Sequence, residues 1–199
     1  MPRGFSDRER ETIRKNLLAC GRERIIAVGM HKTSVGELAR AAHISKGAFY
    51  QFFTTKESLF ITLFEEAERD IRQQMRVLAA QTGNTPQARM RAFLTKAFRT
   101  YLNNPLLQRF TRNDLEALMR GVSPEQLQHA LTDDVEFFTE LIGIWRSTGL
   151  ALACTPQELT GVMQSLSLIV LYAEDFGGGY KATVPFMIEA LADRLVKFE

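Results

Sequence analysis

The sequence contains only two cysteines, one tryptophan and no long apolar run. Cys20 and Cys154 cannot build a disulfide framework, and their spacing suits no metal site. No apolar stretch approaches the ~20 residues that a membrane-spanning helix needs. The charged residues 1–15 lack the apolar segment of a secretory signal. We therefore expect a cytoplasmic protein whose fold depends on neither disulfides nor a metal.

Motifs of catalysis are missing as well. The sequence has no Gly-rich phosphate loop, no nucleophile motif and no His, Asp and Glu set at metal-ligand spacing. Its three histidines are scattered along the chain. These absences argue against an enzyme, and we expect no cofactor and no metal ion.

Charge is unevenly divided between the two ends of a chain that is nearly neutral overall. Residues 1–60 hold eleven Lys and Arg against six Asp and Glu, whereas residues 61–199 hold fourteen against seventeen. A basic segment joined to a mildly acidic one indicates a nucleic-acid module followed by a module with another task. Taken alone, the basic segment could equally be an ordinary solvated surface.

Apolar residues recur at helical spacing almost throughout, and strict alternation never persists, so we expect an all-α fold without a sheet. Ser6 and Glu9 form a capping box at the first helix start. Proline follows a capping residue at Thr85-Pro86, Asn104-Pro105, Ser123-Pro124 and Thr155-Pro156. About nine helices are predicted, at residues 7–28, 34–41, 45–52, 55–81, 86–103, 105–120, 124–148, 156–175 and 185–198.

The second and third of these helices are short and close together. One opens at Thr33 or Ser34, and the next begins at Ser45 after the tight turn His43-Ile44-Ser45. Two short helices joined by such a turn form a helix-turn-helix, which places its second helix in the major groove of DNA.

Residue types in the third helix suit a DNA surface. Ser45 and the free amides of the helix start can bind a phosphate, and small residues after Lys46 allow close approach. Tyr50 can reach a phosphate, whereas Gln51 can pair with adenine. An N-terminal arm could place Arg3 in a minor groove, unless the arm is a tail that makes no contact. The predicted DNA contacts are Thr33, Ser34, Ser45, Lys46, Gly47, Ala48, Tyr50, Gln51, Lys56 and Arg3.

Residues 33–59, TSVGELARAAHISKGAFYQFFTTKESL, resemble the TetR family of bacterial regulators. The family pattern is T-(S/T)-V-x-x-(I/L)-A-x-x-A-G-(V/I)-S-K-G-x-(L/F)-Y-x-(H/Y)-F-x-(S/T)-K-E-x-L, and most positions agree in register. Three positions depart from it: His43 replaces a glycine, Ala48 a frequent threonine, and Phe52 a frequent histidine or tyrosine. The turn at His43 needs a left-handed backbone, which histidine adopts at some cost.

This resemblance implies a helix-turn-helix domain at residues 1–54 and an effector-binding and dimerisation domain at residues 55–199. It implies a repressor that binds a palindromic operator as a homodimer and is released by a small molecule. In the family the last two helices make the dimer, and here both carry apolar stripes. The alternative is that these stripes pack within one subunit. The predicted interface residues are Leu159, Met163, Leu166, Val170, Met187, Leu191 and Leu195.

Aromatic residues of the C-terminal part are candidates for the effector pocket, although aromatic residues at helical spacing can simply form the core. They favour an apolar or aromatic effector. The predicted ligand residues are Phe98, Tyr101, Phe110, Phe138, Trp145 and Met163. A competing hypothesis is a helical small-molecule carrier without DNA function. The small residues and the lysine between Ser45 and Tyr50 argue against it, because a carrier has no need of them.

Overall fold

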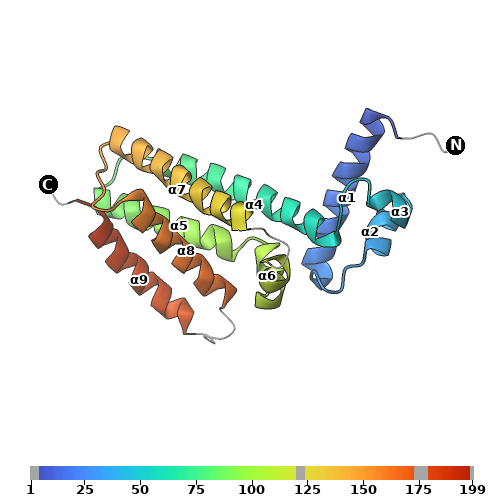
Figure 1. The fold of residues 1–199 in the computed structure, drawn as a ribbon. Helices are drawn as coiled ribbons and strands as arrows, with labels where there is room; N and C mark the ends of the chain where they lie inside the picture. Colours follow the sequence, from blue (N-terminus) through green and yellow to red (C-terminus); the bar gives the residue numbers. More distant parts are fainter. Residues whose placement is uncertain (1–4, 120–123, 173–178, 198–199) are drawn as a thin grey trace. The chain divides into compact units, whose positions relative to one another are not determined.

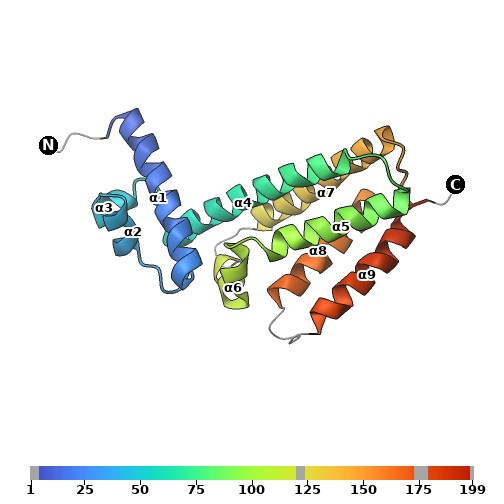
Figure 2. The ribbon, with the colours of Figure 1, turned by 180° about the vertical axis from the view of Figure 1, so that it is seen from behind.

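The computed structural model describes residues 5–119, 124–172 and 179–197, apart from the side chains of residues 124–131, 170, 171, 180 and 181. This part of the chain forms nine α-helices and one short 3-10 helix, which confirms the all-α prediction (Figures 1 and 2). None of the described helices is long and apolar enough to cross a membrane. The helices are α1 (Asp7–Val28), α2 (Val35–Ala41), α3 (Lys46–Phe49), α4 (Lys56–Ala79), α5 (Pro86–Leu102), η1 (Leu107–Arg109), α6 (Arg112–Met119), α7 (Pro124–Ser147), α8 (Pro156–Leu171) and α9 (Tyr180–Leu195).

Most of the predicted helix starts are confirmed. At α1 the Ser6 hydroxyl accepts from the amide of Glu9, whose carboxylate accepts from the amide of Ser6 in return. The same reciprocal box joins Thr155 and Glu158 at α8. Thr85 caps α5, with proline in the first turn. These short-range bonds satisfy amides that a helix start would otherwise leave without a partner.

The chain divides into two compact units. Unit 1 comprises residues 1–68 and 105–121, and unit 2 comprises residues 69–104 and 122–199. α4 therefore contributes its first half to unit 1 and its second half to unit 2. The boundary predicted between residues 54 and 55 separates a DNA-binding part from an effector-binding part, whereas these two units are defined by how the residues pack. That boundary stays a prediction.

Unit 1 has a continuous apolar core in which α1, the helix-turn-helix and α4 meet. Leu17, Ile25 and Leu38 are at most 1% exposed. A Cβ atom added at Gly21 would lie 2.6 Å from a methyl carbon of Leu59, so the glycine lets α1 and α4 approach closely. Further members of the core are Phe49, Phe53, Phe60, Leu63, Leu106 and Leu118.

Unit 2 is a helical bundle in which α5 packs on α8 and α9, and α7 packs on α8. Figures 1 and 2 both show α5, α8 and α9 side by side. The Trp145 ring is 2% exposed and meets the Phe93 ring edge-on, with the ring centroids 4.7 Å apart. Arginine–carboxylate pairs join Arg72 to Asp134 and Arg76 to Glu140, and thereby tie α4 to α7.

The predicted helix 105–120 is wrong in its first turns. Residues 107–109 form the 3-10 helix η1, and α6 begins only at Arg112. Its start is set by Thr111, whose amide and hydroxyl donate to a carboxylate oxygen of Asp114 at 2.9 and 2.7 Å. The helix therefore begins at this reciprocal cap of Thr111 and Asp114 and not at the Asn104-Pro105 signal. Asp114 is held in place by its surroundings, since it is 2% exposed and its other carboxylate oxygen lies 3.2 Å from Nε2 of His31.

The last helix begins earlier than predicted. α9 starts at Tyr180 rather than at Pro185, which lies inside it. A proline there removes one backbone hydrogen bond. The helix continues through it because Val184 and Ile188, on either side, are buried at 2% and 3% exposure, and tertiary packing outweighs local propensity.

The residues predicted for the dimer interface mostly point inward. Leu159, Met163, Leu166 and Leu195 are all at most 5% exposed within the single chain, so no free surface remains on them for a partner. The alternative, packing within one subunit, therefore holds for these residues, and their assignment to the interface is corrected. Met187 and Leu191 are half-buried, and the side chain of Val170 lies outside the described ones.

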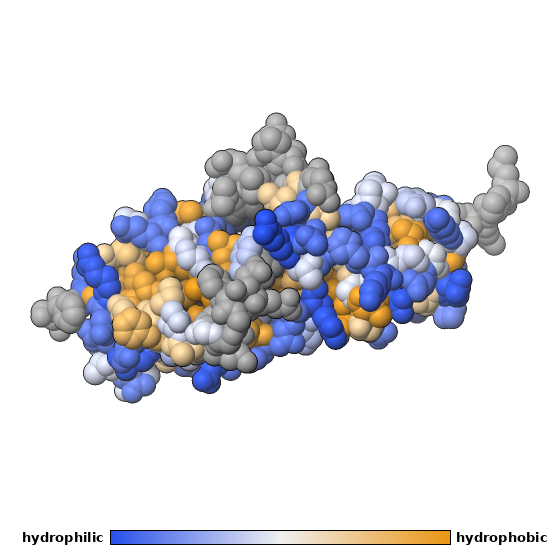
Figure 3. All heavy atoms as spheres, turned by 90° about the horizontal axis from the view of Figure 1, so that it is seen from below, coloured by the Kyte–Doolittle hydropathy of each residue, from blue (hydrophilic) through white to orange (hydrophobic). Residues whose placement is uncertain are grey.

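Other apolar side chains of the same two helices lie at the surface. Leu168 on α8 is 50% exposed and Phe186 on α9 is 73% exposed. Figure 3 shows hydrophobic residues, in orange, at the surface of unit 2 on the side where α9 lies. Monomeric proteins rarely leave a contiguous apolar surface of this kind open to water.

Candidate nucleic-acid interface

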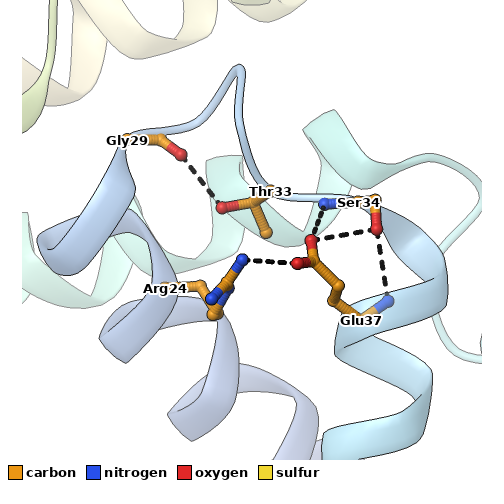
Figure 4. Close-up of polar contacts among 5 residues, drawn as sticks. All are labelled: Arg24, Gly29, Thr33, Ser34 and Glu37. Atoms are coloured by element: carbon orange, nitrogen blue, oxygen red, sulfur yellow. Dashed lines mark hydrogen bonds and ion pairs between the residues drawn. The ribbon is translucent and has the colours of Figure 1, made fainter.

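The start of α2 is held by a network around Glu37 (Figure 4). The Glu37 carboxylate accepts from the amide and hydroxyl of Ser34, both at 3.0 Å, and from Arg24 of α1 at 2.6 Å. The Ser34 amide and hydroxyl, and then the Arg24 guanidinium, lower the pKa of Glu37. Ser34 is therefore the capping residue, and Arg24 ties the helix-turn-helix to α1.

Thr33, next to this cap, is almost completely buried. It is 1% exposed, and its hydroxyl donates to the carbonyl of Gly29 at 2.9 Å, as Figure 4 shows. Gly29 ends α1 with a φ of 83°, a conformation that glycine adopts without strain. We infer that Thr33 stabilises this turn and does not contact DNA.

The turn between α2 and α3 has the backbone that the sequence predicts. His43 has a φ of 58°, and in the described part of the chain no other residue apart from glycine has a positive φ. The amide of the following Ile44 donates to the carbonyl of Ala39 at 2.9 Å, which closes the turn. The turn therefore forms with histidine at a position where the family pattern has glycine.

α3 is shorter than predicted, at residues 46–49 instead of 45–52. The Ser45 hydroxyl caps it by accepting from the amide of Ala48 at 3.1 Å. Phe49 is fully buried, and Phe53 is 4% exposed, so the chain after α3 bends to insert both rings into the core. Ala48 is half-buried. The exposed residues of this segment are Ser45, Lys46, Gly47, Tyr50 and Gln51.

These five residues lie within α3, which is about one turn long, or directly beside it. Tyr50 is 50% exposed, and its ring meets the Phe49 ring edge-on, with the ring centroids 5.5 Å apart. The arrangement offers a hydroxyl, an ammonium, an amide and a stretch of bare backbone within one surface. Such a surface can combine phosphate contacts with readout of a base edge.

Two further residues were predicted to contact DNA, Lys56 and Arg3. Lys56 is half-buried, and its ammonium donates to the carbonyl of Met30 at 3.2 Å. The bond to Met30 ties the start of α4 to the loop before α2. The ammonium also lies 5.8 Å from the centroid of the Phe60 ring. Arg3 lies outside the described residues.

The residues predicted for effector binding fall into both units. Phe110 belongs to unit 1 and packs on Phe64, with ring centroids 4.4 Å apart. The other five lie in unit 2, where Phe138, Trp145 and Met163 are at most 5% exposed and Phe98 and Tyr101 are half-buried. On the surface of unit 2, a shallow and largely open depression of about 400 Å³ lies along α5, beside Ala88, Arg91, Ala92, Thr95, Lys96 and Arg99.

The contacts that hold the start of α6 in unit 1 were missed by the sequence analysis, although a helix was predicted there. The Thr111–Asp114 cap and the His31–Asp114 contact attach α6 to the loop that precedes the helix-turn-helix. The Thr-x-x-Asp spacing is a capping signal that could have located α6. Its contact with His31 could not have been found, because the two residues are far apart in the sequence.

Comparisons with known proteins agree with this geometry. Residues 17–63 match the model of the bacterial regulatory proteins of the TetR family. Comparison with the curated proteins gave no match. The chain is similar in structure to a TetR-family transcriptional regulator of Pectobacterium atrosepticum, with 25% identity, a TM-score of 0.68, and 98% of this chain and 100% of that chain covered.

Two further solved structures have the same fold at lower identity. A TetR/AcrR-family regulator of Thermobifida fusca shares 20% identity at a TM-score of 0.59, over 90% of this chain and 95% of that one. FadR of Thermus thermophilus, a TetR-family repressor in complex with lauroyl-CoA, shares 19% identity at a TM-score of 0.63, over 90% and 92%. The segment 17–63 is therefore a TetR-family helix-turn-helix domain, and the chain has the fold of the TetR family of transcriptional regulators.

Proposed function

We propose that this protein is a cytoplasmic transcriptional repressor that binds a palindromic operator as a homodimer. The observation that supports it most directly is the exposed surface of α3, where Ser45, Lys46, Gly47, Tyr50 and Gln51 stand free of the core. Residues 1–54 would bind DNA, and residues 55–199 would bind an effector and form the dimer. Two α3 helices related by a two-fold axis would then read two half-sites about one DNA turn, roughly 34 Å, apart.

A mobility-shift assay with DNA from the promoter of the protein's own gene tests this function. Retarded migration at physiological salt, competed away only by DNA containing a palindrome, is the expected result. If no DNA is bound at low salt either, the helical carrier becomes the better description. Transcription from that promoter, with and without the protein, then separates a repressor from an activator.

Individual residues of α3 are expected to affect binding in different ways. Lys46→Ala and Tyr50→Phe should weaken binding to all sequences alike, and Lys46→Ala should also lower its salt dependence, because each removes a phosphate contact. Gln51→Ala should relax preference at one base pair per half-site, by about 1–3 kcal/mol. Binding to a set of operators with single base changes distinguishes the two patterns. A uniform loss with Gln51→Ala would contradict its assignment as the base reader.

The proposed dimer uses the outward face of α8 and α9. Leu168 and Phe186 are exposed there in the single chain, on the two helices that the sequence assigned to the interface. Two such helices from each subunit would form a four-helix contact. This moves the proposed interface from the buried stripe around Leu166 to the outward side of the same helices.

The proposed effector is a small, apolar or aromatic molecule that binds in unit 2 and releases the operator. α4 supports this idea, because its first half packs in the core of unit 1 and its second half is paired with α7 through Arg72 and Arg76. Packed elements change arrangement in discrete steps, so a shift of α4 in one unit would bias the other. FadR of Thermus thermophilus, which has this fold, is a repressor that binds lauroyl-CoA.

The effector coupling makes a reciprocal prediction. A molecule found by screening against the full chain should weaken operator binding about 5- to 150-fold, and operator DNA should weaken its binding by the same factor. Affinity for each ligand is measured with and without a saturating amount of the other. A molecule that binds tightly in unit 2 but leaves operator affinity unchanged would refute the coupling and leave DNA binding standing.

A further inference from the structure

Five of the six basic residues of α1 are held in two different ways. Lys15 pairs with Glu11 at 2.8 Å, Arg22 with Glu66 at 3.1 Å, and Arg24 with Glu37 at 2.6 Å. Arg10 and Arg14 have no carboxylate partner among the described residues. Their guanidinium groups instead lie over aromatic rings that closely follow α3.

Arg10 is the more firmly placed of the two. Its guanidinium carbon lies 5.2 Å from the centroid of the Phe52 ring, and one of its nitrogens donates to the backbone carbonyl of Gln51 at 3.3 Å. Phe5 packs on the same ring, with centroids 5.9 Å apart, so Phe52 also holds the beginning of α1. The bond to the backbone carbonyl does not use the side-chain amide of Gln51.

Arg14 lies one helical turn further along α1. Its guanidinium carbon is 4.6 Å from the centroid of the Phe53 ring, which is itself 4% exposed. A ring face attracts a cation and orients it, but it leaves the full positive charge uncompensated. Both arginines are exposed, so each charge remains available to a partner outside the chain.

We propose that Arg10 and Arg14 form a second phosphate-binding element beside α3, with Phe52 and Phe53 as the positioning residues. The proposal rests on the proposed DNA-binding function. Its two arginines lie before the segment 17–63 that matches the family model, whereas the two positioning rings lie inside it. Phosphates line both edges of the groove that a recognition helix enters, so two oriented guanidinium groups at the end of that helix suit the DNA backbone.

The Phe52 ring has a definite place in this arrangement. The family pattern often has histidine or tyrosine at that position, and phenylalanine cannot make the polar contact that those residues offer. In this chain the Phe52 ring is half-buried between Phe5 and Arg10. Its contribution to DNA binding would thus be made through Arg10, which supplies the polar group in its place.

The test measures operator affinity of the full chain by fluorescence anisotropy at several salt concentrations. Arg10→Ala and Arg14→Ala should weaken binding to specific and random DNA by similar factors. The slope of log affinity against log salt should fall by about 0.9 for each phosphate that is no longer neutralised, and each substitution frees one phosphate per subunit. Lys15→Ala is the matched control: it removes the same charge from α1, but Lys15 is paired with Glu11, so its slope should stay as in the wild type.

A further variant tests the positioning role. Phe52→Leu keeps an apolar side chain but removes the ring, and it should lower the salt slope as Arg10→Ala does. Added to Arg10→Ala, it should have no further effect on the slope. Thermal melting of every variant shows whether the fold is retained, and a merely structural role for Phe52 would change the melting temperature without changing the slope.

The possible failures are distinguishable. Wild-type slope and affinity in both arginine variants would overturn the proposal while the DNA-binding function stands. A loss confined to one base pair would overturn it too, because Arg10 or Arg14 would then read a base rather than a phosphate. A wild-type chain that binds no DNA overturns the proposed function and this element together.

Discussion

Phe186→Asp is expected to give a folded monomer, whereas Leu166→Asp is expected to unfold unit 2. Phe186 is 73% exposed in the single chain, so a carboxylate there costs nothing until a partner subunit covers it. Leu166 is 2% exposed, and an unpaired charge buried at such a position costs at least about 3 kcal/mol. That is a large share of the ~5–15 kcal/mol that stabilises a typical domain.

Sedimentation equilibrium and thermal denaturation separate these outcomes. The Phe186→Asp chain should sediment as a monomer, melt cooperatively and bind its operator much more weakly, because a monomer binds one half-site. Val77→Asp is the matched control, since Val77 on α4 is also exposed, at 59%, but does not belong to the proposed interface. A Phe186→Asp chain that remains a dimer would place the interface elsewhere.

Gly47→Leu is expected to weaken specific DNA binding strongly while the protein remains folded. A Cβ atom added at Gly47 would meet only the Ser45 hydroxyl, at 3.9 Å, so the fold itself makes no demand for glycine there. In a helix, leucine is favoured over glycine by about 1 kcal/mol, and the melting temperature should not fall. Glycine at this position would then be needed for DNA binding and not for folding, because a larger side chain would keep α3 away from the major groove.

The loss of affinity should correspond to at least one base contact in each half-site. One such contact is worth about 1–3 kcal/mol, which is roughly 5- to 150-fold in affinity for each half-site. Gly36→Leu on α2 provides the control, because the space around Gly36 is similarly open, with only the Ser34 hydroxyl at 4.0 Å. Anisotropy titrations and melting curves of both variants are compared. If Gly47→Leu binds its operator as the wild type does, α3 is not the recognition helix.

Local signals located most of the helices because their causes are local. Caps such as Ser6 with Glu9, and Ser45 before α3, involve residues three apart, so the pattern and the bond are one feature. The left-handed turn at His43 was expected for a different reason: the resemblance to the TetR family, whose pattern has glycine at this position, implied it. Where two local signals compete, the prediction failed: Asn104-Pro105 is a good helix start, but the buried Asp114 moved the start to residue 112.

The candidate site was identified in part. The exposed residues of α3 follow from the short pattern around Ser45 and Gln51, whereas the burial of Thr33 and the tether of Lys56 to Met30 were not visible. Arg10 and Arg14 were missed altogether. An arginine on a charged helix is usually a solvated side chain, and only the folded chain brings these two onto the rings of Phe52 and Phe53.

The sequence by itself determined most of the helices, the helix-turn-helix and the basic character of the first 60 residues, and its resemblance to the TetR family implied the left-handed turn. These depend on spacing and on contacts within about four residues. The tertiary structure alone decided which face of α8 and α9 lies inward, that α6 joins unit 1 through His31 and Asp114, and which cations of α1 lie on aromatic rings instead of carboxylates. An apolar stripe shows that a face is covered, but not by what. That depends on contacts between residues far apart in the chain, which no local pattern encodes.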